Sequence, residues 1–138
     1  MEINKKLSIV IPTYNRADFL DYNLEVHIPM LKEYGIEIAI FDNASTDNTY
    51  EIIQTLQLEY PSVIKYDRRE TNTPYLDQNF CEAINMTSGE YILLVGDDDD
   101  SLRNLLLNID NFDLEHIYIA NDSGLTSISQ QIFGYYDT

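Results

Sequence analysis

The chain alternates between short apolar runs and longer stretches in which apolar residues recur every three or four positions. Four runs rich in β-branched and aromatic residues are typical of strands, at residues 7–11, 36–41, 63–66 and 91–95. The stretches between them have the apolar spacing of one helix face. Repeated alternation of strand and helix predicts an α/β domain with a mostly parallel sheet and helices on both faces.

Local signals suggest where the helices begin and end. The first helix has its apolar stripe at Leu20, Leu24, Ile28 and Leu31. Pro29 is expected to kink or end this helix near Ile28, and Gly35 to close the segment. Asn48 followed by Glu51 resembles a capping box for the second helix, and Pro74 lies where a third could begin. Beyond residue 120 the alternation fades, and residues 126–138 are compatible with an edge strand or a frayed end.

The composition narrows the classes of function. The chain has 138 residues, enough for one domain with a core, and 24 acidic against 8 basic residues give a net charge of −16. Such a surface repels nucleic acids and anionic membranes. No apolar run approaches the roughly 20 residues needed to cross a bilayer, and no signal peptide is visible, so a cytoplasmic location is expected. The single cysteine, Cys81, excludes an internal disulfide and is expected to be a buried thiol.

Polar residues gather after each predicted strand. They occupy residues 12–16, 42–47, 67–72 and 97–100. In an open α/β sheet, ligands bind beyond the carboxyl ends of the strands, where all these loops would meet. Each loop taken alone fits ordinary turn and capping chemistry. Four polar loops on one edge favour a binding site, in which Tyr14 offers an aromatic face, Thr13 and Asn15 offer hydrogen-bonding groups, and Asp42 offers an acceptor for a base N–H.

The fourth loop consists of four consecutive aspartates, Asp97, Asp98, Asp99 and Asp100. Adjacent like charges repel, so a divalent cation shared with the oxygens of a bound diphosphate would stabilise them. The alternative is a solvated turn that caps the next helix, for which Ser101 is also a capping candidate. Other common sites lack support: the glycine-rich phosphate motifs and the EF-hand pattern are missing, and His27 and His116 are isolated.

Four segments together resemble a known family. They are residues 8–16, residues 41–47, the pair Asn72 and Asn79, and residues 88–92 followed by the aspartates. In this order and spacing they resemble the nucleotide-sugar-binding half of a family 2 glycosyltransferase with the A-type fold, a Rossmann-like nucleotide-diphospho-sugar transferase fold. The resemblance covers residues 7 to about 106.

The resemblance implies roles for individual residues. The donor nucleotide would contact Pro12, Thr13, Tyr14, Asn15, Asp42, Asn43, Asn72, Asn79 and Asp97. Asp42 would pair with the ring N–H of uracil or thymine. The cofactor would be Mg²⁺ or Mn²⁺, held by Asp98 with Asp97 and Asp99 beside it, and would act as a Lewis acid on the leaving diphosphate. Gly96 stands where the family has the first aspartate of its D-x-D motif, which makes Asp98 the first choice of metal ligand.

The family places its acceptor pocket and catalytic carboxylate well downstream of that motif, whereas this sequence ends about 40 residues after it, at Thr138. Glu115 and Asp122 are the acidic candidates in between, and neither has a matching context. The catalytic base is therefore expected downstream of Thr138. We expect residues 1–138 to form a C-terminally truncated, donor-binding part of a glycosyltransferase domain, inactive alone and prone to self-association.

The expected reaction is inverting transfer from a UDP- or dTDP-sugar to a glycan or lipid-linked acceptor in surface polysaccharide assembly. The full-length enzyme could act at the inner face of the membrane. The alternative is a non-catalytic nucleotide-binding or protein-interaction module.

Overall fold

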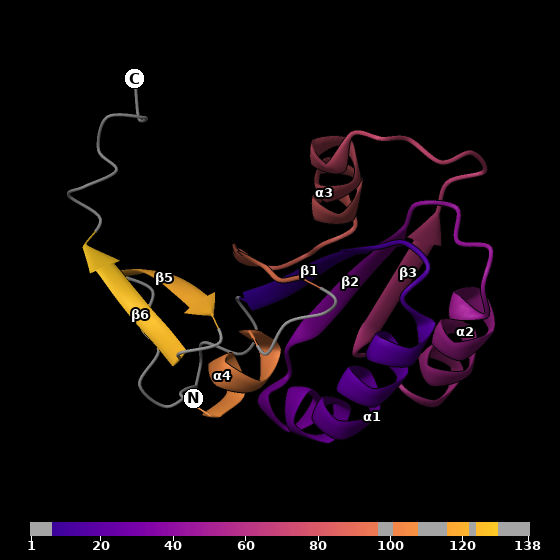
Figure 1. Cartoon of the computed structure of the whole chain (residues 1–138). Helices are drawn as coiled ribbons and strands as arrows, with labels where there is room; N and C mark the ends of the chain where they lie inside the picture. The colour runs from indigo at the N-terminus through magenta and orange to yellow at the C-terminus, as the bar shows by residue number, and fades with distance from the viewer. Residues whose placement is uncertain (1–6, 97–100, 108–115, 122–123, 130–138) are drawn as a thin grey trace. The chain divides into compact units, whose positions relative to one another are not determined.

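A computed structural model describes residues 7–96, 101–107, 116–121 and 124–129. The chain divides into two units, of which the first ends at Asp98. The first unit contains a sheet of four parallel strands in the order β3-β2-β1-β4, drawn in Figure 1. The strands are β1 (Leu7–Thr13), β2 (Glu37–Asp42), β3 (Ile64–Arg68) and β4 (Tyr91–Leu94). The predicted parallel sheet is confirmed.

Strands β1 and β2 form the centre of the sheet. They pair from Ser8 opposite Glu37 to Thr13 opposite Asp42, and every residue of β1 is buried. Both faces of these strands are covered, which explains why their sequences are continuously apolar rather than alternating. Because the strands are parallel, the loops after them open at one edge of the sheet, called the carboxyl edge below.

Helices cover both faces of the sheet, as predicted. They are α1 (Ala17–Tyr34), α2 (Thr49–Glu59) and α3 (Leu76–Asn85). Figure 1 shows α1 and α2 on one face and α3 on the other. The predicted stripe of α1 is buried throughout, at Leu20, Leu24, Ile28 and Leu31.

Of the two effects expected of Pro29, a kink or the end of the helix, the second is wrong. The helix continues through Pro29 to Tyr34, and Gly35 follows as a left-handed cap with φ 67°, as predicted. Pro29 is exposed, as is Glu25, whose carbonyl loses its usual N–H partner at Pro29, while Ile28 and Leu31 pack into the core. Burial of the stripe outweighs the loss of one exposed hydrogen bond.

Two further local predictions are corrected. Asn48 makes no side-chain cap at the start of α2. Asp47 caps the helix instead, because its Oδ1 accepts hydrogen bonds from Thr49 N at 3.0 Å and Thr49 Oγ1 at 2.6 Å. Cys81, predicted to be a buried thiol, lies exposed on α3, whose buried positions are Asn79 and Ala83.

The second unit contains α4 (Ser101–Leu107) and the antiparallel pair β5 (His116–Asn121) and β6 (Gly124–Ser129). Helix α4 contacts both strands, and its Leu102 and Leu106 are buried. For residues 126–138 the sequence was compatible with an edge strand or a frayed end. Residues 126–129 belong to strand β6, and residues 130–138 lie outside the described part. Among the described helices, none combines the length and apolarity required to span a bilayer.

Candidate functional site

Asn15 ties together the loops that follow β1 and β2. Its Oδ1 accepts hydrogen bonds from Thr46 N at 2.7 Å and Asp47 N at 3.2 Å, and its own N–H donates to Ser45 Oγ at 2.9 Å. These bonds hold Asn15 at φ 51°, a left-handed conformation that asparagine tolerates better than most residues. The sequence predicts a donor contact for Asn15; in the structure this residue fixes the relative position of two loops.

Asp42 lies at the end of β2 and is completely buried. Its Oδ1 accepts a hydrogen bond from Ser45 N at 2.8 Å, and its Oδ2 accepts one from Tyr66 Oη at 2.7 Å. Burial and the bond to Asp42 raise the pKa of Tyr66, so this phenol remains a donor. Because Asp42 is completely buried, a base could pair with it directly only if the surrounding groups moved.

Asn43 and Asn72 hold the loop between β3 and α3. Asn43 Nδ2 donates to Thr73 O at 2.8 Å, and Asn43 Oδ1 accepts from Thr73 N at 2.9 Å. Asn72 Nδ2 adds a bond to Asn43 O at 3.0 Å. The Asn43 amide therefore acts like a short piece of backbone, which pairs with a segment 30 residues away.

Arg69 orients Asn79 on α3. The Arg69 Nε donates to Asn79 Oδ1 at 2.8 Å, and the Arg69 guanidinium carbon lies 5.3 Å from the centre of the Phe41 ring. A second anchor is the bond from Arg69 N to Asp42 O at 2.9 Å. Because an arginine nitrogen can only donate, the bonded atom of Asn79 must be its oxygen, which leaves the NH₂ group as the donor of this side chain.

These loops enclose a cavity of ≈ 270 Å³ at the carboxyl edge, lined by Pro12, Thr13, Tyr14, Arg16, Asn43, Leu76 and Asn79. It brings together five of the predicted donor-binding residues. Asn15, Asp42 and Asn72 do not line it and support the loops instead. Sequence reasoning did not propose Arg16, although a basic residue in the loop after β1 of so acidic a chain was a signal available in the sequence.

Positive charge is distributed unevenly over the first unit. Arg16, Arg68 and Arg69 lie at the carboxyl edge, on or beside the loops of the cavity. Arg68 Nη2 donates to Ser45 O at 3.0 Å, and its guanidinium carbon lies 5.3 Å from the Tyr50 ring centre. The lysines Lys32 and Lys65 lie toward the opposite end of the sheet, near the end of α1 and beside Glu37. The arginines of the first unit thus lie at the carboxyl edge, where they can attract an anion, alongside the acidic residues Asp42, Asp47, Asp67 and Glu70 of the same loops.

The predicted metal ligands Asp97, Asp98 and Asp99 lie outside the described residues. The described chain reaches Gly96 directly after β4, which pairs with β1, and Val95 N donates to Val10 O at 3.0 Å. Within the described ranges, no group of three or more histidine, cysteine, aspartate or glutamate side chains is placed to hold a metal ion.

The position of the catalytic base is a separate prediction. Glu115 and Asp122, the acidic candidates within the chain, also lie outside the described residues, as does Thr138, after which the base is expected. No described residue therefore bears on the expectation of a base downstream of Thr138, which stays a prediction.

Residues 8–109 match the family Glycosyl transferase family 2. Abequosyltransferase RfbV of Salmonella typhimurium is 36% identical over 110 residues, which make up 76% of this chain and 33% of that protein. Poly(ribitol-phosphate) beta-glucosyltransferase of Bacillus spizizenii is 36% identical over 114 residues, or 80% of this chain and 18% of that protein. The chain thus spans a third or less of the length of these relatives.

Solved structures show the same fold. S. aureus TarS 1-349 in complex with UDP-GlcNAc matches with a TM-score of 0.59 and 25% identity, over 77% of this chain and 31% of that chain. A mannosyltransferase from Pyrobaculum calidifontis, solved with GDP-Man and Mn²⁺, matches with a TM-score of 0.64 and 18% identity, over 80% of this chain and 33% of that chain. The predicted nucleotide-sugar transferase fold is confirmed, and this chain belongs to glycosyl transferase family 2.

Proposed function

We propose that the cavity at the carboxyl edge binds the nucleotide part of a UDP- or dTDP-sugar, for a glycosyltransferase that helps to assemble a cell-surface polysaccharide. The observation that carries this proposal is that Pro12, Thr13, Tyr14, Asn43 and Asn79 line one cavity together with a cation, Arg16. The names of the related abequosyltransferase and glucosyltransferase support the reaction class, and the UDP-GlcNAc complex of TarS supports a uridine nucleotide.

Each lining residue has a chemical role in this proposal. Tyr14 is 45% exposed and offers a ring face on which a base can stack. Thr13 and the NH₂ group of Asn79 supply polar contacts to the ribose or base, and Arg16 attracts the diphosphate. Asp42 acts as a positioning residue, because it holds the turn to Ser45 from inside the protein. The acceptor, a glycan or a lipid-linked glycan, would bind outside this cavity.

We further propose that a divalent cation, Mg²⁺ or Mn²⁺, is held by Asp98 with Asp97 and Asp99. Three considerations support it: the aspartates follow the strand that pairs with β1, their mutual repulsion favours a cation, and a protein of this fold is solved with Mn²⁺. When bound, the ion would polarise the diphosphate as a Lewis acid. The inverting course of the transfer and a cytoplasmic location remain parts of this proposal.

Isothermal titration calorimetry tests nucleotide binding. The chain should bind UDP in the presence of Mn²⁺ and bind it more weakly in a chelator, and ADP should bind more weakly than UDP. Asn79→Asp keeps an oxygen for Arg69 but removes the NH₂ donor and adds a negative charge, so UDP affinity should fall about tenfold or more. Asn85→Asp, the same change at the exposed end of the same helix, is the matched control and should bind normally.

The outcomes separate the two functions. If UDP, dTDP and their sugars all fail to bind the folded chain with and without metal, the nucleotide-site proposal fails and the interaction module gains support. If UDP binds equally well to wild type and to Asn79→Asp, a nucleotide site exists elsewhere. Equal affinity with Mn²⁺ and with chelator would remove the metal from the proposal while leaving the cavity in place.

A further inference from the structure

Helix α1 carries a second apolar stripe on the side that faces away from the sheet. Its members are Phe19, Tyr22, Val26 and Met30, exposed to 49%, 69%, 54% and 38% respectively. Single exposed apolar side chains are common on protein surfaces, whereas a row of them is associated with an interface. These four residues follow one another at i, i+3, i+7 and i+11, the spacing of neighbours on one helix face, so they form a row about 16 Å long.

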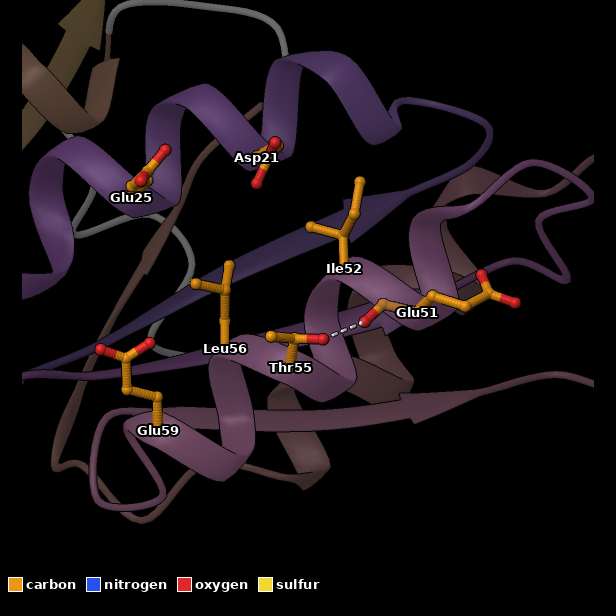
Figure 2. A pocket seen from close by; sticks show the side chains of 7 residues that line it. All are labelled: Asp21, Glu25, Glu51, Ile52, Thr55, Leu56 and Glu59. Atoms are coloured by element: carbon orange, nitrogen blue, oxygen red, sulfur yellow. Dashed lines mark hydrogen bonds between the residues drawn. The ribbon is translucent and has the colours of Figure 1, made fainter.

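A band of carboxylates runs beside this apolar stripe. Asp21 and Glu25 of α1 and Glu51 and Glu59 of α2 border a groove of ≈ 420 Å³ between the two helices, shown in Figure 2. Ile52, Thr55 and Leu56 complete its lining, which includes no basic residue. Glu25 follows the stripe residue Tyr22 by three positions, the spacing of neighbours on a helix surface, so the groove and the stripe lie on adjoining sides of one helix.

The charges indicate what kind of partner fits. Helix α1 contains four acidic residues, Asp18, Asp21, Glu25 and Glu33, against one lysine, Lys32. Pairing of two copies through this face would bring like charges together in a chain of net charge −16. An anionic membrane is disfavoured for the same reason. A basic partner would gain attraction from the carboxylates as well as burial of the apolar row.

We propose that the outer face of α1 is a docking surface for a basic amphipathic helix of another protein. The apolar side of that helix would cover Tyr22, Val26 and Met30, and a row of lysines or arginines beside it would face Asp21, Glu25 and the carboxylates of α2. This is the helix-on-helix mode of recognition, in which apolar anchors supply affinity and charges at the border select the partner. Tyr22, Val26 and Met30 do not line the nucleotide cavity, so this inference does not rest on the proposed function. The two surfaces approach each other at Phe19, whose ring centre lies 5.6 Å from the guanidinium carbon of the cavity residue Arg16.

A designed peptide provides a direct test. The probe is a fluorescent helical peptide with leucines along one face and lysines beside them. One control peptide has the same composition in shuffled order, so that no apolar face forms, and a second replaces the lysines with glutamates. Fluorescence anisotropy with the full chain should show binding of the first peptide only, at affinities that weaken with salt.

Variants of the chain locate the site. Tyr22→Ser combined with Val26→Ser should weaken peptide binding about tenfold or more, whereas Leu58→Ser, at an 83% exposed apolar residue of α2 outside the stripe, should leave it unchanged. Asp21→Asn combined with Glu25→Gln should weaken binding and reduce its dependence on salt. Circular dichroism establishes that each variant is folded; these surface positions are outside the core, so folding should be retained.

Three results would overturn the proposal. Equal binding of the shuffled peptide would show that only bulk charge is recognised. Unchanged binding to the folded Tyr22→Ser/Val26→Ser variant would place the site elsewhere. Sedimentation showing a dimer that this variant dissociates would assign the stripe to a second copy of the chain instead of a basic partner.

Discussion

Glu37 offers the clearest test of how the fold is held together, at the end of the sheet away from the site. Its carboxylate accepts hydrogen bonds from Ser8 Oγ at 2.6 Å, from Ser88 Oγ at 2.8 Å and from the Ser88 N–H, and Lys65 Nζ lies 3.0 Å from it. These groups belong to β1, β2, β3 and the segment before β4. One side chain thus links three strands of the sheet and the segment that leads into the fourth.

The perturbation is Glu37→Gln. Burial alone would raise the pKa of Glu37, but the hydrogen bonds from Ser8, Ser88 and Lys65 lower it from 4.5 to about 2. That difference corresponds to about 3 kcal/mol at 1.36 kcal/mol per pH unit. The Lys65 side chain is 40% exposed, and solvent weakens its share, so we expect the substitution to cost about 2 kcal/mol of unfolding free energy at pH 7.

The direction of the pH dependence follows from the lowered pKa. The ionised carboxylate stabilises the folded chain fully above pH 4.5, and this contribution declines as the pH falls from 4.5 through about 2. Urea denaturation should therefore show a difference between wild type and Glu37→Gln that is largest at pH 7 and reduced by roughly half or more at pH 3.

Glu33→Gln is the matched control, since Glu33 is an exposed carboxylate of α1; this change should have an effect within about 0.5 kcal/mol. A difference between wild type and Glu37→Gln that is below about 0.5 kcal/mol at pH 7, or the same at both pH values, would refute the reasoning.

Three further predictions concern single residues. Ala44 has φ 62°, so Ala44→Gly should raise the unfolding free energy by about 0.5–1 kcal/mol, measured by thermal denaturation. Tyr66→Phe leaves one oxygen of buried Asp42 without its donor and should cost about 1–3 kcal/mol, whereas Tyr91→Phe at an exposed position should have little effect in the same urea titration. Because Cys81 is exposed, its rate of reaction with a thiol reagent in the native chain should be within about tenfold of the rate in the denatured chain. A native rate far below that range would contradict the exposed placement of Cys81 on α3.

The sequence was sufficient to predict the sheet because burial on both faces leaves continuous apolar runs, but it misplaced the effect of prolines. The first strand was predicted over residues 7–11, yet Pro12 lies inside β1 and pairs with Phe41. Thr13 O accepts a hydrogen bond from Asn43 N, so the backbone groups of Thr13 face β2. Neighbouring residues of a strand direct these groups to opposite sides, so the nitrogen of Pro12 faces the side of β4. The pairing between β1 and β4 has already ended there, at Val10. The missing N–H of Pro12 therefore interrupts no hydrogen bonds between strands. This can be seen only from the register of β1 with both of its neighbours, which the sequence does not give.

The site was predictable in outline for a related reason. Parallel strands bring their carboxyl ends to one edge, so Thr13, Tyr14 and Asn43 could be assigned to a common site from order alone. The sequence could not show which of the predicted residues line the cavity and which support the loops. Whether Asn15 contacts a ligand or a neighbouring loop depends on Thr46 and Asp47, 31 and 32 residues away, and on an αL conformation that the sequence does not specify.

The amides at the carboxyl edge explain how an acidic protein can prepare a site for an anion. Asn15, Asn43 and Asn72 connect three loops through hydrogen bonds in which one side chain can both donate and accept, and they add no charge. In the described part of the chain, no buried side-chain oxygen or nitrogen lacks a partner. The loops are thus held by the protein itself, so little conformational entropy would be lost when a ligand binds. The charge of that ligand would then be met chiefly by Arg16 and a bound cation, which makes affinity for a diphosphate sensitive to salt and metal.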